Sequence, residues 1–100
     1  MANVVSYNSY KLQKGASAQD FLLATEVLIK EFVSKQKGFI SFKHLFDGET
    51  WADFLVFESM YDLNAFVLLC EKNELTRKHF STFGESGTLK SHTFTIKQSF

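Results

Sequence analysis

Two residues that could cooperate in acid–base chemistry, His44 and Asp53, flank a turn-like segment at residues 47–50. If the flanking segments form a hairpin with position 46 opposite 51, the two side chains lie directly opposite on one face. A carboxylate beside an imidazole fixes its tautomer and raises its basicity, which suits a general base or a pH-sensitive ligand clamp. A polar pair that only satisfies itself among apolar residues gives the same pattern, and both interpretations stay open.

Asn8 and His79 are the other candidates for catalytic residues. Asn8 lies in the middle of an apolar segment, where a buried amide has to find partners or present its donors to a ligand. His79 follows two basic residues on a helical segment and has Phe80 near it, although a partly exposed helix histidine is the simpler interpretation. His92, on a segment of strand character, is expected to be an edge or interface histidine.

Several other kinds of site are not expected, because their sequence motifs are absent. No HxH, HExxH or CxxC spacing occurs, so no metal site is expected, and there is no glycine-rich phosphate loop. The single cysteine, Cys70, has no nearby histidine and is expected to be a small core residue rather than a nucleophile. Residues 37–42 begin like an RNA-binding motif, but they lead into the wrong strand. The 11 basic and 11 acidic residues also balance, so no nucleic-acid partner is expected.

The elements that must position these residues follow from periodicity and turn residues. Ser17 with Asp20, and Ser59 with Asp62, resemble capping boxes that open two helices. The first helix is expected to end at Gly38, and the second to break at Asn73. Strands are predicted at residues 4–12, 39–46, 51–58 and 88–96, and helical segments at 17–37, 59–72 and 74–83.

This order of strand, helix, strand, strand, helix, strand is the ferredoxin-like plan. It predicts an α+β fold in which residues 1–100 form one domain, with a four-stranded antiparallel sheet and its helices on one face. Both faces of the strands are apolar, and the helices cover only one. We therefore expect a homodimer in which two sheets pack together as an α/β barrel. The face expected to be left open for the second copy carries Phe42, His44, Trp51, Leu55 and Phe57.

The 12 phenylalanines occur in nearly every predicted element, which predicts an aromatic cavity for a small apolar or amphipathic molecule, such as a fatty acid, a polyketide or a ring compound. The residues expected to line it are Tyr10, Phe42, Trp51, Leu55, Phe57, Phe66 and Phe83. The start of the chain has no secretory pattern, and no run of apolar residues is long enough to span a membrane. With one cysteine and no membrane partner, a cytoplasmic protein is expected.

The chain resembles the dimeric α/β-barrel superfamily, specifically its antibiotic-biosynthesis-monooxygenase-like group. The resemblance is carried by residues 12–15 (LQKG), 57–59 (FES) with 65–66 (AF), and 77–80 (RKHF) followed by Phe83. It implies a homodimer with a cavity in each subunit between sheet and helices. Some members of the group oxidise aromatic polyketides or quinols without a cofactor, others degrade haem, and many have no known activity.

Three alternatives remain once the resemblance is added. The first is a non-enzymatic binder of a small apolar molecule. The second is a monooxygenase, either cofactor-independent, with His79 or the His44–Asp53 pair as base and Asn8 as orienting donor, or haem-degrading. The quinol-oxidising members carry a helix histidine where this chain has Leu69, and the haem-degrading members carry a tryptophan where it has Phe66. No cofactor is therefore the first expectation and haem the alternative. The third is a structural dimer without a ligand.

Overall fold

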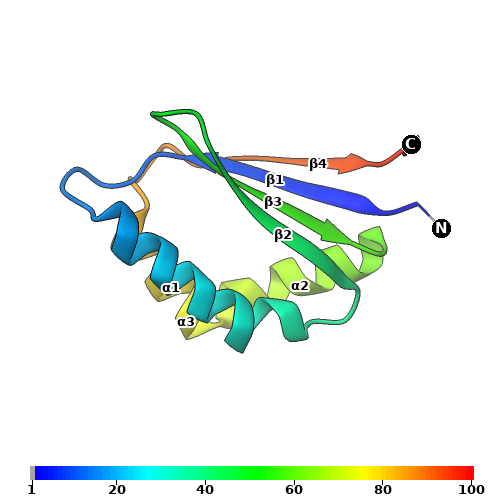
Figure 1. Cartoon of the computed structure of the whole chain (residues 1–100). Coiled ribbons are helices and arrows are strands. Elements are labelled where there is room, and N and C mark those ends of the chain that lie inside the picture. Colours follow the sequence, from blue (N-terminus) through cyan, green and yellow to red (C-terminus); the bar gives the residue numbers. More distant parts are fainter. Residues whose placement is uncertain (1) are drawn as a thin grey trace.

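The computed structural model describes residues 2–100 as a four-stranded antiparallel sheet with three α-helices on one face (Figure 1). The strands lie in the spatial order β2-β3-β1-β4. Their bounds are Val4–Tyr10 (β1), Phe39–Phe46 (β2), Trp51–Phe57 (β3) and Lys90–Thr95 (β4). The helices are α1 (Ala18–Glu31), α2 (Met60–Lys72) and α3 (Glu74–Phe83), and a short 3₁₀ helix, η1 (Val33–Lys35), follows α1. The predicted α+β ferredoxin-like class is confirmed.

The helices begin where the sequence predicts. The side chains of Ser17, Ser59 and Asn73 each accept a hydrogen bond from the backbone N–H three residues later, which satisfies one of the free donors at each helix start. The predicted end of the first helix at Gly38 is wrong. The α-helix stops at Glu31, and η1 buries Val33 in the core before the chain turns into β2.

Strands β1 and β4 are shorter than predicted. β1 ends at Tyr10, and beyond it Leu12 forms only an isolated bridge with Gly84, because the chain there leaves the sheet to reach α1. β4 is confined to Lys90–Thr95. Within residues 2–100, no helix has both the length and the apolar character needed to cross a membrane.

The strand register confirms the predicted opposition of His44 and Asp53. Asp53 lies in the central strand β3 and pairs with His44 of β2 on one side and with Asn8 of β1 on the other. These three residues therefore form one row across the sheet. In the next row, Trp51 separates Phe46 from Tyr10.

The expectation about which face stays open is wrong. The face that carries His44 and Asp53 lies beneath the helices, where Phe57 packs against Phe66 of α2 with ring centroids 5.1 Å apart. Both faces are apolar, so alternation alone does not distinguish them. The crossover through α1 between the parallel strands β1 and β2 decides which face is covered, because such connections have a fixed hand.

Two buried clusters form the core on the covered face. One is centred on Phe57 and Leu63, and the other contains Tyr10, Phe21 and Trp51. Among residues 2–100, no helix or further strand lies over the opposite face of the sheet (Figure 1). The covered layer therefore holds every residue of the predicted polar cluster.

Candidate functional site

A cavity of about 620 Å³ lies between the covered face of the sheet and the three helices. Its walls are mainly apolar and come from every layer, including Phe42 and Leu55 of the sheet, Leu28 of α1, Phe66 of α2 and Phe83 of α3. Polar side chains from the sheet and from α3 interrupt this wall. The arrangement is a mainly apolar cavity with a few polar groups, which is the usual composition of a small-molecule site.

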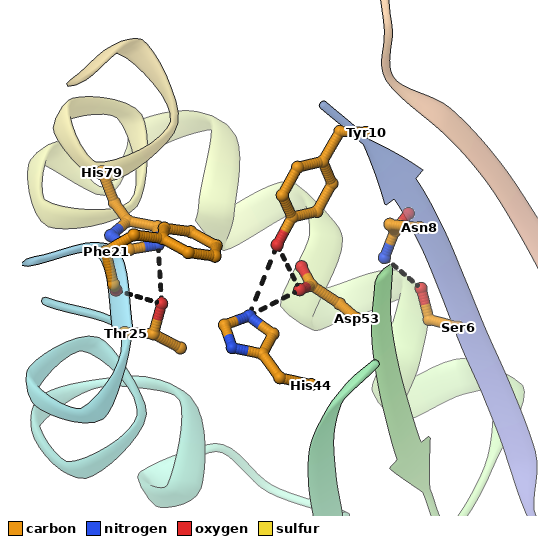
Figure 2. A network of polar contacts seen from close by, with 8 residues as sticks. All are labelled: Ser6, Asn8, Tyr10, Phe21, Thr25, His44, Asp53 and His79. Atoms are coloured by element: carbon orange, nitrogen blue, oxygen red, sulfur yellow. Dashed lines mark hydrogen bonds and ion pairs between the residues drawn. The ribbon is translucent and has the colours of Figure 1, made fainter. Parts of the chain in front are cut away.

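Asp53 is the centre of the polar groups on the sheet (Figure 2). Tyr10 Oη donates a hydrogen bond of 2.6 Å to Asp53 Oδ1, and His44 Nε2 lies 3.1 Å from the same oxygen. Tyr10 Oη and His44 Nε2 are 3.4 Å apart. A carboxylate only accepts hydrogen bonds, so His44 donates through Nε2, and its neutral form keeps a lone pair on Nδ1.

Tyr10 is held as a donor. Burial, followed by the charge and hydrogen bond of Asp53, raises the pKa of Tyr10 well above its usual range. The hydroxyl therefore stays protonated throughout the physiological range and continues to donate to Asp53. In this arrangement Tyr10 stabilises the carboxylate, and the carboxylate orients His44.

Phe21 of α1 connects this group to His79 of α3. The Phe21 ring stacks on the His44 ring with centroids 5.0 Å apart and on the His79 ring with centroids 5.4 Å apart. His79 Nε2 lies 3.1 Å from Thr25 Oγ1 (Figure 2). Burial lowers the pKa of His79, nearby His44 lowers it further, and Asp53 opposes the shift. His79 is therefore neutral at neutral pH.

The structure brings together all four predicted catalytic candidates. Asn8, His44, Asp53 and His79 line the same cavity, and Asn8 Nδ2 donates to Ser6 Oγ at 3.2 Å. Of the residues predicted to contact a ligand, those that line the cavity are Tyr10, Phe42, Leu55, Phe66 and Phe83. Their roles stay predictions.

Trp51 and Phe57 are placed elsewhere. Phe57 is completely buried in the core, and Trp51 packs edge-on against Phe21 with centroids 5.2 Å apart. Neither residue lines the cavity. Their aromatic character reflects packing, which a sequence pattern does not separate from ligand contact.

Phe21 and Thr25 are cavity residues that the sequence did not single out. Both lie on the inward face of α1, where a phenylalanine is indistinguishable from core. The hydroxyl of Thr25 is the available signal, because a polar group among inward helix positions needs a partner. Its partners prove to be the backbone carbonyl of Phe21 and His79, 54 residues away.

The remaining candidates differ in exposure. Cys70 lines the cavity, and burial raises the pKa of its thiol to about 11, so it is not a thiolate at neutral pH. His92 is exposed on the opposite face of the sheet, stacked on Phe94 with centroids 6.1 Å apart. It therefore lies outside the cavity.

The donor set does not favour a metal ion, or a haem held through histidine Nε2. Among residues 2–100, no three histidine, cysteine or acidic side chains are grouped closely enough to hold a metal ion. For haem, His79 directs Nε2 to Thr25 and stacks on Phe21, while His44 directs Nε2 to Asp53. Nε2 of both imidazoles is therefore already engaged in a hydrogen bond, and no step is assigned to haem.

Comparisons with known proteins identify the fold. No sequence model of a protein family matches the chain, and no curated protein is significantly similar to it in sequence. Among solved structures, SnoaB, a cofactor-independent oxygenase from Streptomyces nogalater, is 13% identical, with a TM-score of 0.73 over 99% of this chain and 97% of that one.

Two further structures are similar to a comparable degree. The ActVA-Orf6 monooxygenase of Streptomyces coelicolor, solved with the ligand nanaomycin D, is 16% identical, with a TM-score of 0.71 over 99% of this chain and 91% of that one. NE2512 of Nitrosomonas europaea, a protein of unknown function, is 14% identical, with a TM-score of 0.72 over 100% and 94% of the two chains. The chain therefore has the fold of the antibiotic-biosynthesis-monooxygenase-like proteins, as the sequence resemblance predicts.

Proposed function

We propose that the cavity binds a small, largely apolar molecule that carries at least one hydroxyl group, such as a hydroxylated aromatic or polyketide-type compound. The observation that carries the proposal is the cavity itself, about 620 Å³ of mainly apolar space with polar groups in its wall. Sites for small molecules commonly have volumes of roughly 300–1,000 Å³.

The polar groups specify how such a ligand would lie. Asp53 and His44 present acceptor atoms beside Phe42 and Leu55, so a hydroxyl group can donate to them while the ring contacts the apolar wall. A fully apolar ligand would leave these polar groups without a compensating partner, which costs affinity. A hydroxylated aromatic is therefore favoured over a fatty acyl chain.

A matched pair of probes tests the proposal. Amide ¹H–¹⁵N spectra are recorded during titration with 1-naphthol and with 1-methylnaphthalene, which has a similar shape without the hydroxyl. We expect 1-naphthol to shift the signals of cavity residues and to bind about tenfold more tightly, the value of one good hydrogen bond. Shifts confined to the outer surface, or an equal affinity for both probes, would count against the site.

Filling the cavity supplies the protein-side control. Cys70 lines the cavity, whereas its neighbour Leu69 is half exposed on the helix surface. Cys70→Phe is expected to reduce 1-naphthol binding at least tenfold, and Leu69→Phe to leave it unchanged. Loss of binding in both variants would indicate a general defect rather than an occupied cavity.

A second candidate function is a cofactor-independent oxygenase, favoured by the imidazole of His44 backed by Asp53 and by the likeness in fold to SnoaB. His44 or His79 would remove a proton from a hydroxylated aromatic to give an electron-rich anion. Reaction of that anion with O₂ would convert an activated CH₂ group to C=O and release one water. The substrate supplies all four electrons that O₂ accepts, so no external reductant is needed.

The three histidines of the chain give a matched test of this chemistry. Oxygen uptake is measured with electron-rich hydroxylated aromatics for His44→Gln, His79→Gln and His92→Gln. Loss of one general base is expected to cost about 10²–10⁴-fold in rate, whereas His92, outside the cavity, is expected to be dispensable. If all three variants turned over substrate at the same rate as the wild-type protein, the oxygenase proposal would be eliminated.

We also propose that the protein is a homodimer joined through the uncovered face of its sheet. That face carries Tyr7, Phe54 and Phe94, and Phe94 is 55% exposed in the single chain. Apolar groups on an open sheet face favour a second layer. A second copy of this chain would supply one by symmetry.

A further inference from the structure

The Thr25 hydroxyl has two partners and only one hydrogen to give. Thr25 lies on α1 and is 5% exposed. Its Oγ1 is 2.8 Å from the backbone carbonyl oxygen of Phe21, and two oxygens at this separation need a proton between them. The hydroxyl hydrogen is therefore committed to Phe21, and Oγ1 meets His79 Nε2, at 3.1 Å, as an acceptor.

This commitment determines the tautomer of His79. Nε2 has to carry a hydrogen to donate to Thr25, and a neutral imidazole then keeps its lone pair on Nδ1. Among residues 2–100, no side-chain nitrogen or oxygen that is buried from solvent lacks a hydrogen-bond partner. Within that part of the chain, Nδ1 of His79 has no hydrogen-bond partner, so it is not buried from solvent, and His79 lines the cavity.

We propose that Thr25 is a positioning residue, which holds His79 in its Nε2–H tautomer so that Nδ1 is the atom that meets a ligand. The Phe21 ring fixes the plane of the imidazole by stacking on it. Asp53 imposes the same tautomer on His44, so the two imidazoles, which both stack on the Phe21 ring, each offer Nδ1 as an acceptor. A ligand that donates two hydrogen bonds, such as a dihydroxylated aromatic, matches that pair.

The ligand-contact part of this inference rests on the proposed function, whereas the tautomer does not. The tautomer is read from long-range ¹H–¹⁵N spectra of histidine-labelled protein without ligand, with the His79 signals assigned by their absence in His79→Gln. The wild-type protein is expected to show a pyrrole-type Nε2 and a pyridine-type Nδ1. A protonated Nδ1 in the wild-type protein would overturn the proposal.

Two substitutions separate positioning from packing. Thr25→Val keeps the shape but removes the acceptor, and we expect the single-tautomer pattern to be lost. Thr25→Ser keeps the hydroxyl and is expected to restore it. An unchanged pattern in Thr25→Val would overturn the role of Thr25. If Thr25→Val does not fold, the role of Thr25 is tested on the His79 Nε2–H signal of the wild-type protein. A hydrogen bonded to Thr25 exchanges slowly with solvent and shows a nuclear Overhauser effect to the Thr25 side chain. A rapidly exchanging Nε2–H without that effect would overturn the proposal.

Binding of 1,5-dihydroxynaphthalene gives the ligand-dependent arm. Thr25→Val is expected to weaken it about tenfold, the value of one hydrogen bond, while Thr25→Ser binds within about twofold of the wild-type protein. A changed tautomer in Thr25→Val with unchanged affinity would show that His79 Nδ1 does not contact the ligand. Absence of binding to the wild-type protein would instead count against the proposed function.

Discussion

At the scale of single residues, the chemistry of the site depends on which side chains donate hydrogen bonds to Asp53 and Thr25. Asp53 Oδ1 accepts hydrogen bonds from Tyr10 and His44. Thr25 Oγ1 donates its own hydrogen to the Phe21 carbonyl and accepts a hydrogen bond from His79. Each imidazole that donates through Nε2 keeps a free lone pair on Nδ1. The free atom of each imidazole is consequently an acceptor, which is why a donating ligand is proposed.

The Tyr10 hydroxyl should contribute measurably to stability. A hydrogen bond from a buried hydroxyl to a carboxylate contributes about 1.5–3 kcal/mol, so Tyr10→Phe is expected to lower the free energy of unfolding by that amount. Tyr7 lies on the same strand but on the opposite face, which makes Tyr7→Phe the matched control, with an expected change within about 0.5 kcal/mol. Urea unfolding measures both. Equal losses in the two variants would contradict the assigned role of Asp53 as acceptor.

His79 should make stability depend on pH in a defined direction. Burial lowers its pKa in the folded protein, so below the ordinary histidine value of about 6.5 the unfolded chain binds a proton that the folded protein does not. This contribution is full above pH 6.5 and is lost as pH falls through the lowered folded pKa. His79→Gln is expected to flatten the curve of unfolding free energy in this window. A steeper curve in His79→Gln would contradict the direction of the shift.

The sequence could predict the pair His44–Asp53 because pairing register follows from the turn between them. It could not predict that Tyr10 joins the pair from the next row, since that contact depends on how a long side chain leans across the strands. The contact between Thr25 and His79 joins positions 54 residues apart on two helices, and helix periodicity says nothing about which helices meet. Strand and helix periodicity thus predicted the His44–Asp53 pair, but not the contacts of Tyr10 and Thr25 that complete the site.

At the scale of elements, the helix starts were predictable and the covered face was not. Ser17 and Ser59 act through bonds within four residues, so their spacing alone predicts a cap. Which face of the sheet lies under the helices depends on the hand of the crossover and on both faces being apolar. Phe42 and Phe54 are equally aromatic, yet only Phe42 faces the helices and lines the cavity.

The turn at Gly38, which leads the chain from η1 into β2, should be intolerant of a side chain. Its φ is +86°, and a Cβ there would lie 2.5 Å from the carboxylate of Asp62 in α2. Gly38→Ala is therefore expected to cost about 1–3 kcal/mol from the backbone alone, with a further loss from the contact. Gly15 has the same φ but open space around it, so Gly15→Ala isolates the backbone part. Thermal unfolding that ranks the two variants equally would show that Asp62 moves aside freely.

At the scale of the whole molecule, one chain has one covered and one uncovered sheet face. The central row of the uncovered face places Phe54 between Lys43 and Tyr7, with His92 beyond Tyr7. A row with aromatic residues at its centre and polar residues at its ends resembles the core and rim of a protein interface. The helix surface also exposes apolar side chains, among them Leu68, which is 62% exposed. The two surfaces therefore compete as explanations for any self-association.

Charge substitutions on these two surfaces decide between them. Sedimentation velocity is expected to give the wild-type protein a mass twice that of one chain. Phe54→Lys would place an unpaired charge in each half of a symmetric sheet-to-sheet interface, at a cost of several kcal/mol, and is expected to give a folded monomer. Leu68→Lys, an exposed apolar position on α2, is expected to remain dimeric. Dissociation in Leu68→Lys but not in Phe54→Lys would move the interface to the helices, and a monomeric wild-type protein would remove the dimer altogether. Because the cavity lies on the covered face, the Phe54→Lys monomer should still bind 1-naphthol.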